Sequence, residues 1–366
     1  MSINEILTIL CQHLLASTRI NPMKKYLLLP LVLFFMAGAQ AALDGEQLFK
    51  KHCSVCHGDD GRGGVGVPLS LPSFIDSVSD EYLKVTIREG RPGRIMPAFS
   101  MLSDAQISAI VGYMRSWSKQ PAITDNMAPV KGDSAHGAQV FSQYCAHCHG
   151  ADGRGGTGTG VTFSRKRDLP IIAPALNNAG FLAAASDQMI RNTIIRGREG
   201  TPMTPMLVKG LSVTDVDDVV SYIRSFQQQH QTPAEQEVPA PSLIADSPYG
   251  LDETVENIKQ AIANANFTLI RVDYLEHGLV EEGQENRKQV VVHFCNFNFL
   301  FKALAIDPRV GMFLPCSVTA VEKDGKVQVF AMNPQRLSSL FNNDELDSVC
   351  KQMTSVYKNI LEDAVL

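Results

Sequence analysis

The chain has 366 residues, 45% of them hydrophobic, which is enough for two or three domains with ordinary cores. Its formal net charge is -5, and counting Asp, Glu, Lys and Arg gives about 0 for residues 42–122, +1 for 123–231 and -8 for 232–366. A nucleic-acid-binding protein would need a strongly basic face. This distribution therefore argues against a nucleic-acid partner.

The first 41 residues have the pattern of an export signal. Met23-Lys24-Lys25 precedes an apolar stretch from Tyr26 to Met36, and the small-residue sequence Ala39-Gln40-Ala41 follows. We expect cleavage after Ala41, a mature chain in the periplasm and no stable membrane span. An uncleaved anchor is the alternative, and translation from Met23 explains residues 1–22 better than a structural role does.

An internal repeat organises residues 42–231. Six residues between Gly45 and Gly58 recur 92 positions later, and five residues between Thr86 and Gly93 recur 107 positions later. A helical block that begins at Leu102-Ser103 recurs 109 positions later. The helical block places apolar residues on one face in both copies, with Ser103 as a candidate N-cap in the first. These residues are Ile107, Ile110, Val111 and Met114, and then Val216, Val219, Val220 and Ile223.

Each copy contains the pentapeptide pattern C-x-x-C-H, as Cys53-Ser54-Val55-Cys56-His57 and as Cys145-Ala146-His147-Cys148-His149. This is the attachment pattern of c-type haem. Two cysteines on one helical turn can reach the two vinyl groups at one edge of the macrocycle, and the next residue can face the iron. Each copy contains long loops with few core-forming residues. A covalently held haem would therefore supply the core that each copy lacks.

A thioredoxin-like redox pair and a zinc site are the alternatives to haem. The first would need a strand-to-helix context, and the second would need its ligands shared within one domain. We therefore expect two haem c groups, attached to Cys53 and Cys56 and to Cys145 and Cys148.

The axial ligands of the two irons follow from the same repeat. His57 and His149 supply one ligand each, and methionine thioethers are candidates for the other. Met96 is the first candidate, with Met101 as its alternative; Met203 is the second, with Met206 as its alternative.

Ligand histidines usually donate their second ring N–H to a fixed acceptor. The sequence suggests the carbonyl oxygens of Pro72 and Pro174 for this role. Three further histidines of the repeats, His52, His136 and His147, are interpreted as solvated residues.

On these motifs, residues 42–122 and 132–231 each resemble class I c-type cytochrome domains. The resemblance implies all-α domains whose terminal helices cross, with Phe49 against Tyr113 and Phe141 against Tyr222. The second copy departs from the pattern through a longer loop that includes Arg165-Lys166-Arg167.

Residues 232–248 contain four prolines and predict a linker. Residues 249–366 predict an α+β domain, so the expected fold is two all-α cytochrome c domains followed by one α+β domain. The predicted elements are a helix with Val255, Ile258 and Ile262 on one face, strands near 267–272, 290–294, 317–322 and 327–332, and a helix over 344–363. Lys323-Asp324-Gly325-Lys326 predicts a hairpin turn. This order resembles the family called domain of unknown function 302, a resemblance that names a fold and no activity.

The C-terminal cysteines allow two interpretations. Cys295 and Cys316 could form a disulfide or remain buried thiols in an oxidising compartment. They could instead form a redox-active pair or a soft-metal site with His293 and Met312. Cys350 makes the count odd and is expected to be buried.

The sequence therefore predicts a protein that transfers electrons to and from redox partner proteins through two haems. Two methionine candidates favour a carrier over an enzyme, because a dihaem peroxidase or oxidase would keep one iron open. The alternative is a redox enzyme whose C-terminal domain acts on a sulfur or metal substrate while the haems relay electrons. A weaker alternative makes that domain a docking module for a basic partner.

Overall fold

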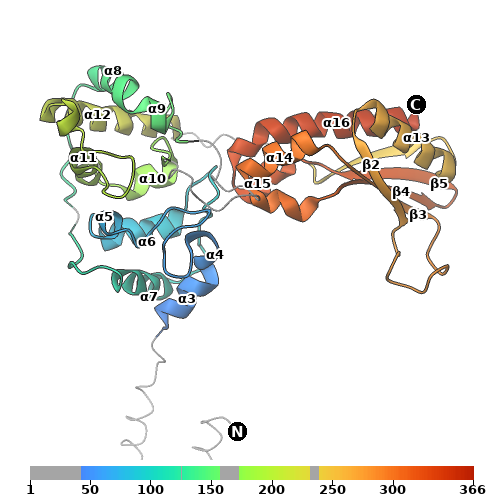
Figure 1. The fold of residues 1–366 in the computed structure, drawn as a ribbon, viewed down its shortest axis with the longest axis horizontal. Coiled ribbons are helices and arrows are strands. Elements are labelled where there is room, and N and C mark those ends of the chain that lie inside the picture. The colour runs from blue at the N-terminus through green and yellow to red at the C-terminus, as the bar shows by residue number, and fades with distance from the viewer. Residues whose placement is uncertain (1–42, 125, 157–172, 231–238) are drawn as a thin grey trace, which may run out of the picture. The chain divides into compact units, whose positions relative to one another are not determined.

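A computed structural model describes residues 43–124, 126–156, 173–230 and 239–366 (Figure 1). The predicted signal peptide, the Arg165–Arg167 loop and residues 232–238 of the predicted linker lie outside the described residues. Within the described part, Gly45–Leu366 group into one compact unit. None of the described helices combines the length and apolar character that a membrane crossing requires.

The first cytochrome-like repeat consists of helices joined by loops. Its helices are α3 (Gly45–His52), α4 (Ser54–His57), α5 (Pro72–Ile75), α6 (Asp80–Glu89) and α7 (Asp104–Arg115). The Ser103 side chain caps α7 by accepting a hydrogen bond from the Gln106 amide, and the Gln106 side-chain oxygen accepts one from the Ser103 amide. The four apolar residues predicted for this helix are all buried, which confirms the assigned face.

The second repeat has the same plan. Its elements are α8 (Ser134–Tyr144), α9 (Ala146–His149), α10 (Ala179–Ala184), α11 (Asp187–Arg196), η1 (Leu207–Lys209), α12 (Val213–Ser225) and η2 (Phe226–His230). Helix α12 begins at a capping box formed by Ser212 and Asp215, and its predicted apolar face is buried. The periodic pattern therefore located both copies of the closing helix correctly.

The first and last helices of each repeat touch at their backbones. A Cβ atom on Gly45 would lie 2.0 Å from the carbonyl oxygen of Ala109, and one on Gly137 would lie 2.0 Å from that of Asp218. Only glycine permits this approach, which brings the predicted aromatic pairs into contact. The ring centroids are 5.6 Å apart for Phe49 and Tyr113 and 5.3 Å apart for Phe141 and Tyr222.

One arginine in each closing helix holds it to the rest of its repeat. The guanidinium of Arg115 donates to the Asp80 carboxylate and to the carbonyl oxygens of Ile75 and Val78. Arg224 makes the corresponding three contacts with Asp187, Leu182 and Ala185. Because a buried carbonyl left without a donor is costly, these arginines fix the segment that precedes α6 and α11.

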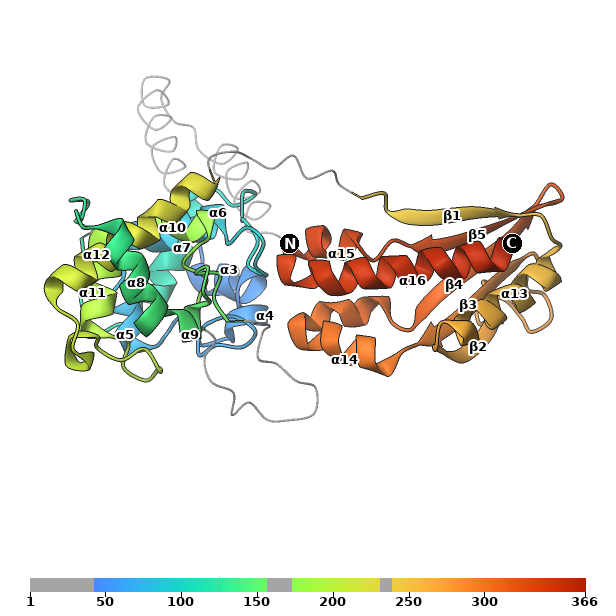
Figure 2. The ribbon, with the colours of Figure 1, turned by 90° about the horizontal axis from the view of Figure 1, so that it is seen from above.

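The C-terminal domain contains one antiparallel sheet in the order β1-β5-β4-β3-β2. Its elements are β1 (Ser242–Ser247), α13 (Leu251–Asn264), β2 (Thr268–Tyr274), β3 (Gln289–Cys295), α14 (Phe297–Ile306), η3 (Pro308–Phe313), β4 (Cys316–Lys323), β5 (Lys326–Met332), α15 (Arg336–Phe341), η4 (Asp344–Leu346) and α16 (Asp347–Val365). Figure 2 shows α16 running along the sheet. The predicted α+β class is confirmed.

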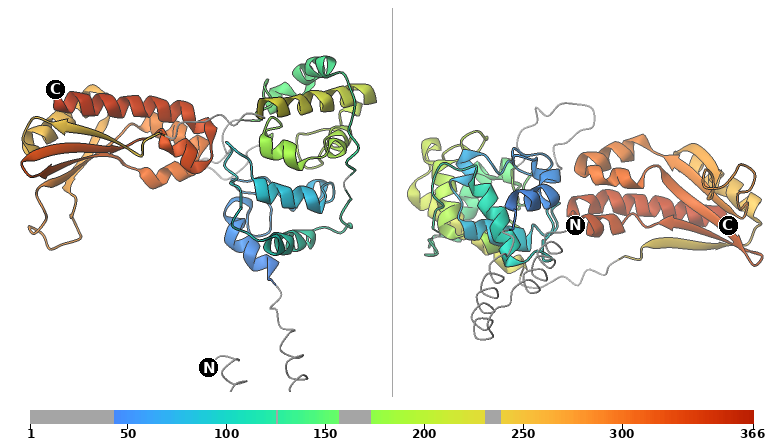
Figure 3. Two further views of the ribbon diagram at one scale, coloured as in Figure 1. Left: turned by 180° about the vertical axis from the view of Figure 1, so that it is seen from behind. Right: turned by 90° about the horizontal axis from the view of Figure 1, so that it is seen from below.

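Two helices form the core of this domain with the sheet (Figure 3). Ile258 and Ile262 of α13 and Ile360 of α16 are fully buried against Phe294 of β3 and Val318 of β4. Burying apolar side chains of this size stabilises a fold by roughly 1.5–3 kcal/mol each relative to exposure. The helical face predicted from Ile258 and Ile262 is therefore the core face.

Two features of the sheet concern the predictions made from the sequence. Asp324 and Gly325 have φ angles of 52° and 73°, and Lys323 pairs with Lys326, so the predicted hairpin turn is confirmed. Strand β1, by contrast, lies inside the segment 232–248 assigned to a linker. It pairs with β5 along its whole length, and as an edge strand it tolerates the prolines that flank it.

Candidate haem sites

The two C-x-x-C-H motifs occupy equivalent turns. Cys53 lies between α3 and α4, and its carbonyl oxygen accepts hydrogen bonds from the amides of Cys56 and His57 at 3.1 and 3.0 Å. In the second repeat the corresponding distances from Cys145 are 3.1 and 2.9 Å. Each motif therefore forms a single helical turn, which places two thiols and an imidazole at adjoining positions.

The first histidine is held by a backbone oxygen. His57 is 9% exposed, and its Nδ1 donates to the carbonyl oxygen of Val67 at 2.8 Å. A Cβ atom on Gly66 would lie 2.6 Å from the imidazole Cε1, so this loop fits closely against the ring. With Nδ1 occupied, Nε2 is the nitrogen that can bind a metal.

The second histidine repeats this arrangement with a different loop. His149 Nδ1 donates to the carbonyl oxygen of Pro174 at 3.0 Å, which confirms the acceptor predicted for this site. The prediction of Pro72 for the first site is wrong. Pro72 occupies the first turn of α5, where its carbonyl oxygen accepts from the Asp76 amide inside the helix.

Burial sets the protonation of both sites. It lowers the pKa values of His57 and His149, which favours neutral imidazoles that can act as metal ligands. It raises the pKa of Cys53 to about 12 and that of Cys145 to about 11. Haem c attachment uses the two sulfurs as thioethers and the neutral imidazole as an iron ligand. The donor set therefore fits haem.

The methionine loops of the two repeats contain equivalent hydrogen bonds. The Arg91 amide donates to the Met96 carbonyl oxygen at 2.9 Å, and the Arg198 amide donates to that of Met203 at 2.7 Å. Met96 and Met203 are both partly buried. Met101, the alternative in the first repeat, is 72% exposed. Met96 and Met203 thus occupy equivalent positions in the two repeats.

Met206 has a different counterpart in the first repeat. Its amide donates to the Ile194 carbonyl oxygen at 3.0 Å, as the Phe99 amide donates to that of Ile87 at 3.1 Å. Met206 therefore takes the place of a packing aromatic residue, and its side chain packs against the hydrophobic core of the repeats.

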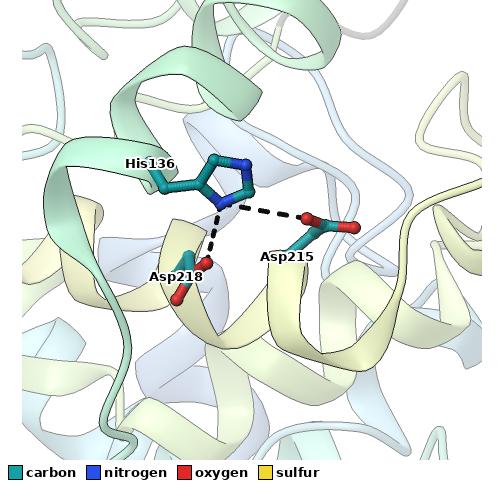
Figure 4. A group of neighbouring side chains, drawn as sticks. All are labelled: His136, Asp215 and Asp218. Atoms are coloured by element: carbon teal, nitrogen blue, oxygen red, sulfur yellow. Dashed lines mark hydrogen bonds and ion pairs between the residues drawn. The ribbon is translucent and has the colours of Figure 1, made fainter.

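His136, which was interpreted as solvated, is exposed, and it also belongs to a polar cluster (Figure 4). His136 Nδ1 lies 2.8 Å from the Asp218 carboxylate and 3.9 Å from that of Asp215. Asp218 is 5% exposed and also accepts from the Asp133 amide, while Asp215 belongs to the capping box of α12. These bonds join α8 to α12. The Asp218 hydrogen bond raises the pKa of His136 in the folded protein. The pair therefore stabilises the fold fully below the pKa that His136 has in the unfolded chain, and this contribution is lost as pH rises through its pKa in the folded protein.

The C-terminal cysteines gather around one cavity of about 70 Å³. Cys295, Cys316 and Cys350 all line it, and the Tyr357 side chain hydrogen-bonds to Cys316. Burial raises the pKa values of all three thiols, that of Cys350 to about 12. Burial therefore favours the neutral form of each cysteine wherever it is present as a thiol.

The other two residues proposed for a metal site lie elsewhere. His293 Nε2 is 3.8 Å from the Asp273 carboxylate, and Met312 is 69% exposed. Neither lines the cavity. In the β3–β4 register Cys316 pairs with Phe294 and His293 pairs with Ser317, while Cys295 and Cys316 both line the cavity.

Three protein families match successive parts of the chain. Residues 40–114 match the family described as cytochrome c oxidase, cbb3-type, subunit III, and residues 134–227 match cytochrome c. Residues 244–364 match a domain of unknown function, DUF302. The chain therefore has two cytochrome c domains followed by a DUF302 domain, and two cytochrome c domains imply binding of haem c.

Curated relatives match the two cytochrome domains. The cbb3-type cytochrome c oxidase subunit FixP of Azorhizobium caulinodans is 29% identical over 188 residues, covering 47% of this chain and 58% of the relative. Subunit CcoP of Cereibacter sphaeroides is 29% identical over 195 residues, covering 50% and 60%. The cytochrome bc1 complex cytochrome c subunit of Mycobacterium leprae is 26% identical over 204 residues, covering 51% and 62%. The chain spans about three fifths of the length of these relatives.

Proposed function

We propose that this protein transfers electrons in the periplasm through two covalently bound c-type haems, each with one histidine and one methionine axial ligand. The observation that supports this most directly is the repeated ligand geometry. In both repeats a backbone oxygen accepts a hydrogen bond from Nδ1 of the histidine. In both, an equivalent hydrogen bond from an arginine amide to the methionine carbonyl oxygen holds the methionine loop. When bound, each haem iron supplies one-electron oxidation and reduction.

The protein contributes position and shielding to this chemistry. With Nδ1 held by a backbone oxygen, His57 and His149 would each bind a haem iron through Nε2, and Met96 and Met203 would supply the soft sulfur ligands. Six-coordinate iron leaves no position for a substrate, which favours a carrier over an enzyme at the haems. The sequence of residues 23–41 supports export.

The partners are proposed as other redox proteins. The matched relatives carry the names of subunits of a cbb3-type oxidase and of a bc1 complex. These are different complexes, so the feature that the names share is a subunit of a larger cytochrome-containing complex. We extend only this feature to the present chain.

Carbon monoxide binding tests the proposed carrier function. The reduced protein is expected to bind no carbon monoxide at neutral pH, because Met96 and Met203 fill both sixth positions. A redox titration should show two reversible one-electron steps. Met96→Ala is the control, because it should open one iron and bind one equivalent of gas. Stoichiometric binding to the unmodified protein would instead indicate a haem enzyme.

The cavity in the C-terminal domain favours a second candidate function. Three cysteines around one cavity could serve a redox enzyme acting on a sulfur or metal substrate, with the haems relaying electrons. We propose the simpler role, a structural disulfide between Cys295 and Cys316 in the oxidising periplasm.

Thiol counting separates these two roles. Haem attachment consumes four cysteines of the mature chain, so free thiols can come only from Cys295, Cys316 and Cys350. With the disulfide, denatured oxidised protein should show one thiol, and metal analysis should find haem iron alone. Cys350→Ser should then show none. Three thiols, or stoichiometric copper, would support the enzyme.

A further inference from the structure

The loop that carries Met96 is bonded to a single side chain of the DUF302 domain. Asn342 Nδ2 donates to the carbonyl oxygens of Arg91, Arg94 and Met96 at 3.0, 2.8 and 3.0 Å. Asn342 Oδ1 accepts from the Gly93 amide at 2.9 Å. One amide group thus uses both its donor and its acceptor capacity on one short loop.

Neighbouring residues of the same domain strengthen this contact. The Asp344 amide donates to the Gly93 carbonyl oxygen at 2.9 Å, and the Glu345 carboxylate forms an ion pair with Arg94. That ion pair is largely shielded, with side-chain exposures of 25% for Arg94 and 16% for Glu345. Gly93 has a φ of 71°, which favours glycine, and a Cβ atom there would lie 2.2 Å from the Asp344 carboxylate, so that side chain would have to move.

Contacts within the DUF302 domain itself hold Asn342 in position. It ends α15 in the left-handed conformation, with φ 50°. The next residue, Asn343, donates to the Asp307 carboxylate, which also accepts from Arg309, and Arg309 in turn donates to the Phe341 carbonyl oxygen. Asp307 is fully buried. This network fixes the position of Asn342 and makes the contact a prearranged one.

The second methionine loop has different partners. The Ser73 hydroxyl donates to the Glu199 carbonyl oxygen, and Arg198 donates to the Ser73 carbonyl oxygen and to the Ser77 hydroxyl. These partners belong to the first cytochrome domain. The contact through Asn342 is therefore a feature of the first haem site, and the second haem serves as an internal reference.

We propose that Asn342 is a positioning residue through which the DUF302 domain sets the strength of Met96 ligation at the first haem. This inference rests on the proposed His and Met ligation. A thioether is a soft ligand that other ligands can displace, and displacement requires the Met96 loop to move. Groups that hydrogen-bond to ligands or their supports commonly change metal affinity by about 10–100-fold. The DUF302 domain therefore couples its own position to the first haem.

Two substitutions at position 342 test the proposal in the full-length protein. N342G keeps the left-handed backbone and removes the four hydrogen bonds. N342D keeps the shape but turns an oxygen toward three carbonyl oxygens, so it should weaken the loop further. Titration of the oxidised protein with imidazole, which competes with methionine for iron, measures the effect. One haem should bind imidazole about 10–100-fold more tightly, more so in N342D, while the other is unchanged.

Matched controls come from Asn266, which also ends a helix of this domain with a left-handed φ of 60° and is exposed. N266G and N266D should bind imidazole as the unmodified protein does. Unchanged binding in both Asn342 variants, or an equal change at both haems, would overturn the proposal. If the unmodified protein shows no methionine-to-iron band at the first haem, the proposed ligation fails instead.

Discussion

The purified mature protein is expected to contain two covalently bound haems per chain, as measured by the pyridine haemochrome assay. Replacing Cys145 and Cys148 together by alanine should leave one. The expected loss is complete at that site, because both thioether bonds depend on these sulfurs. The second repeat should also lose stability, since its loops depend on the haem for a core.

Cys350→Ala provides the matched control for haem content. Cys350 is buried, but it lies in the last helix and outside both motifs. This variant is expected to lose some stability and to retain two haems. If unmodified protein carries one haem or none, or if acidified acetone extracts the haem, the reading of both motifs is wrong.

Local patterns of the sequence predicted the parts of the fold that depend on local chemistry. The two capped closing helices follow from 3.6-residue periodicity, and the hairpin at Asp324-Gly325 follows from the φ angles that the turn requires. The haem motif is also local, since five consecutive residues define it. Each of these features can be recognised without knowing which segments meet.

Contacts through backbone atoms were predicted only in part: the Pro174 carbonyl oxygen was identified as the acceptor of His149, but the acceptor of His57 was not. The Val67 carbonyl oxygen holds His57, but every residue offers a carbonyl oxygen, so no side chain marked the position. Strand β1 was missed because an edge strand flanked by prolines reads as a linker. Asn342 contacts a loop about 250 residues earlier in the chain, and nothing near it in the sequence indicates that partner.

The choice between Met203 and Met206 gives the second large expected effect. Met203→Leu keeps the volume of the side chain and removes its sulfur, so it should abolish the weak near-infrared band of methionine-to-iron ligation at the second haem. About half of the band should remain, from Met96. The physical reason is position, because the Arg198 amide holds Met203 as the Arg91 amide holds Met96.

Met206→Leu is the matched control for this experiment. Met206 packs where the first repeat has Phe99, so its replacement should leave the band intact and should change the free energy of unfolding by less than about 1.5 kcal/mol. Spectra of both variants should be recorded on oxidised protein with two attached haems. Loss of the band in Met206→Leu, with retention in Met203→Leu, would assign the ligand to Met206. It would also mean that the longer loop of the second repeat shifts the ligand by three residues from the position that repeat symmetry predicts.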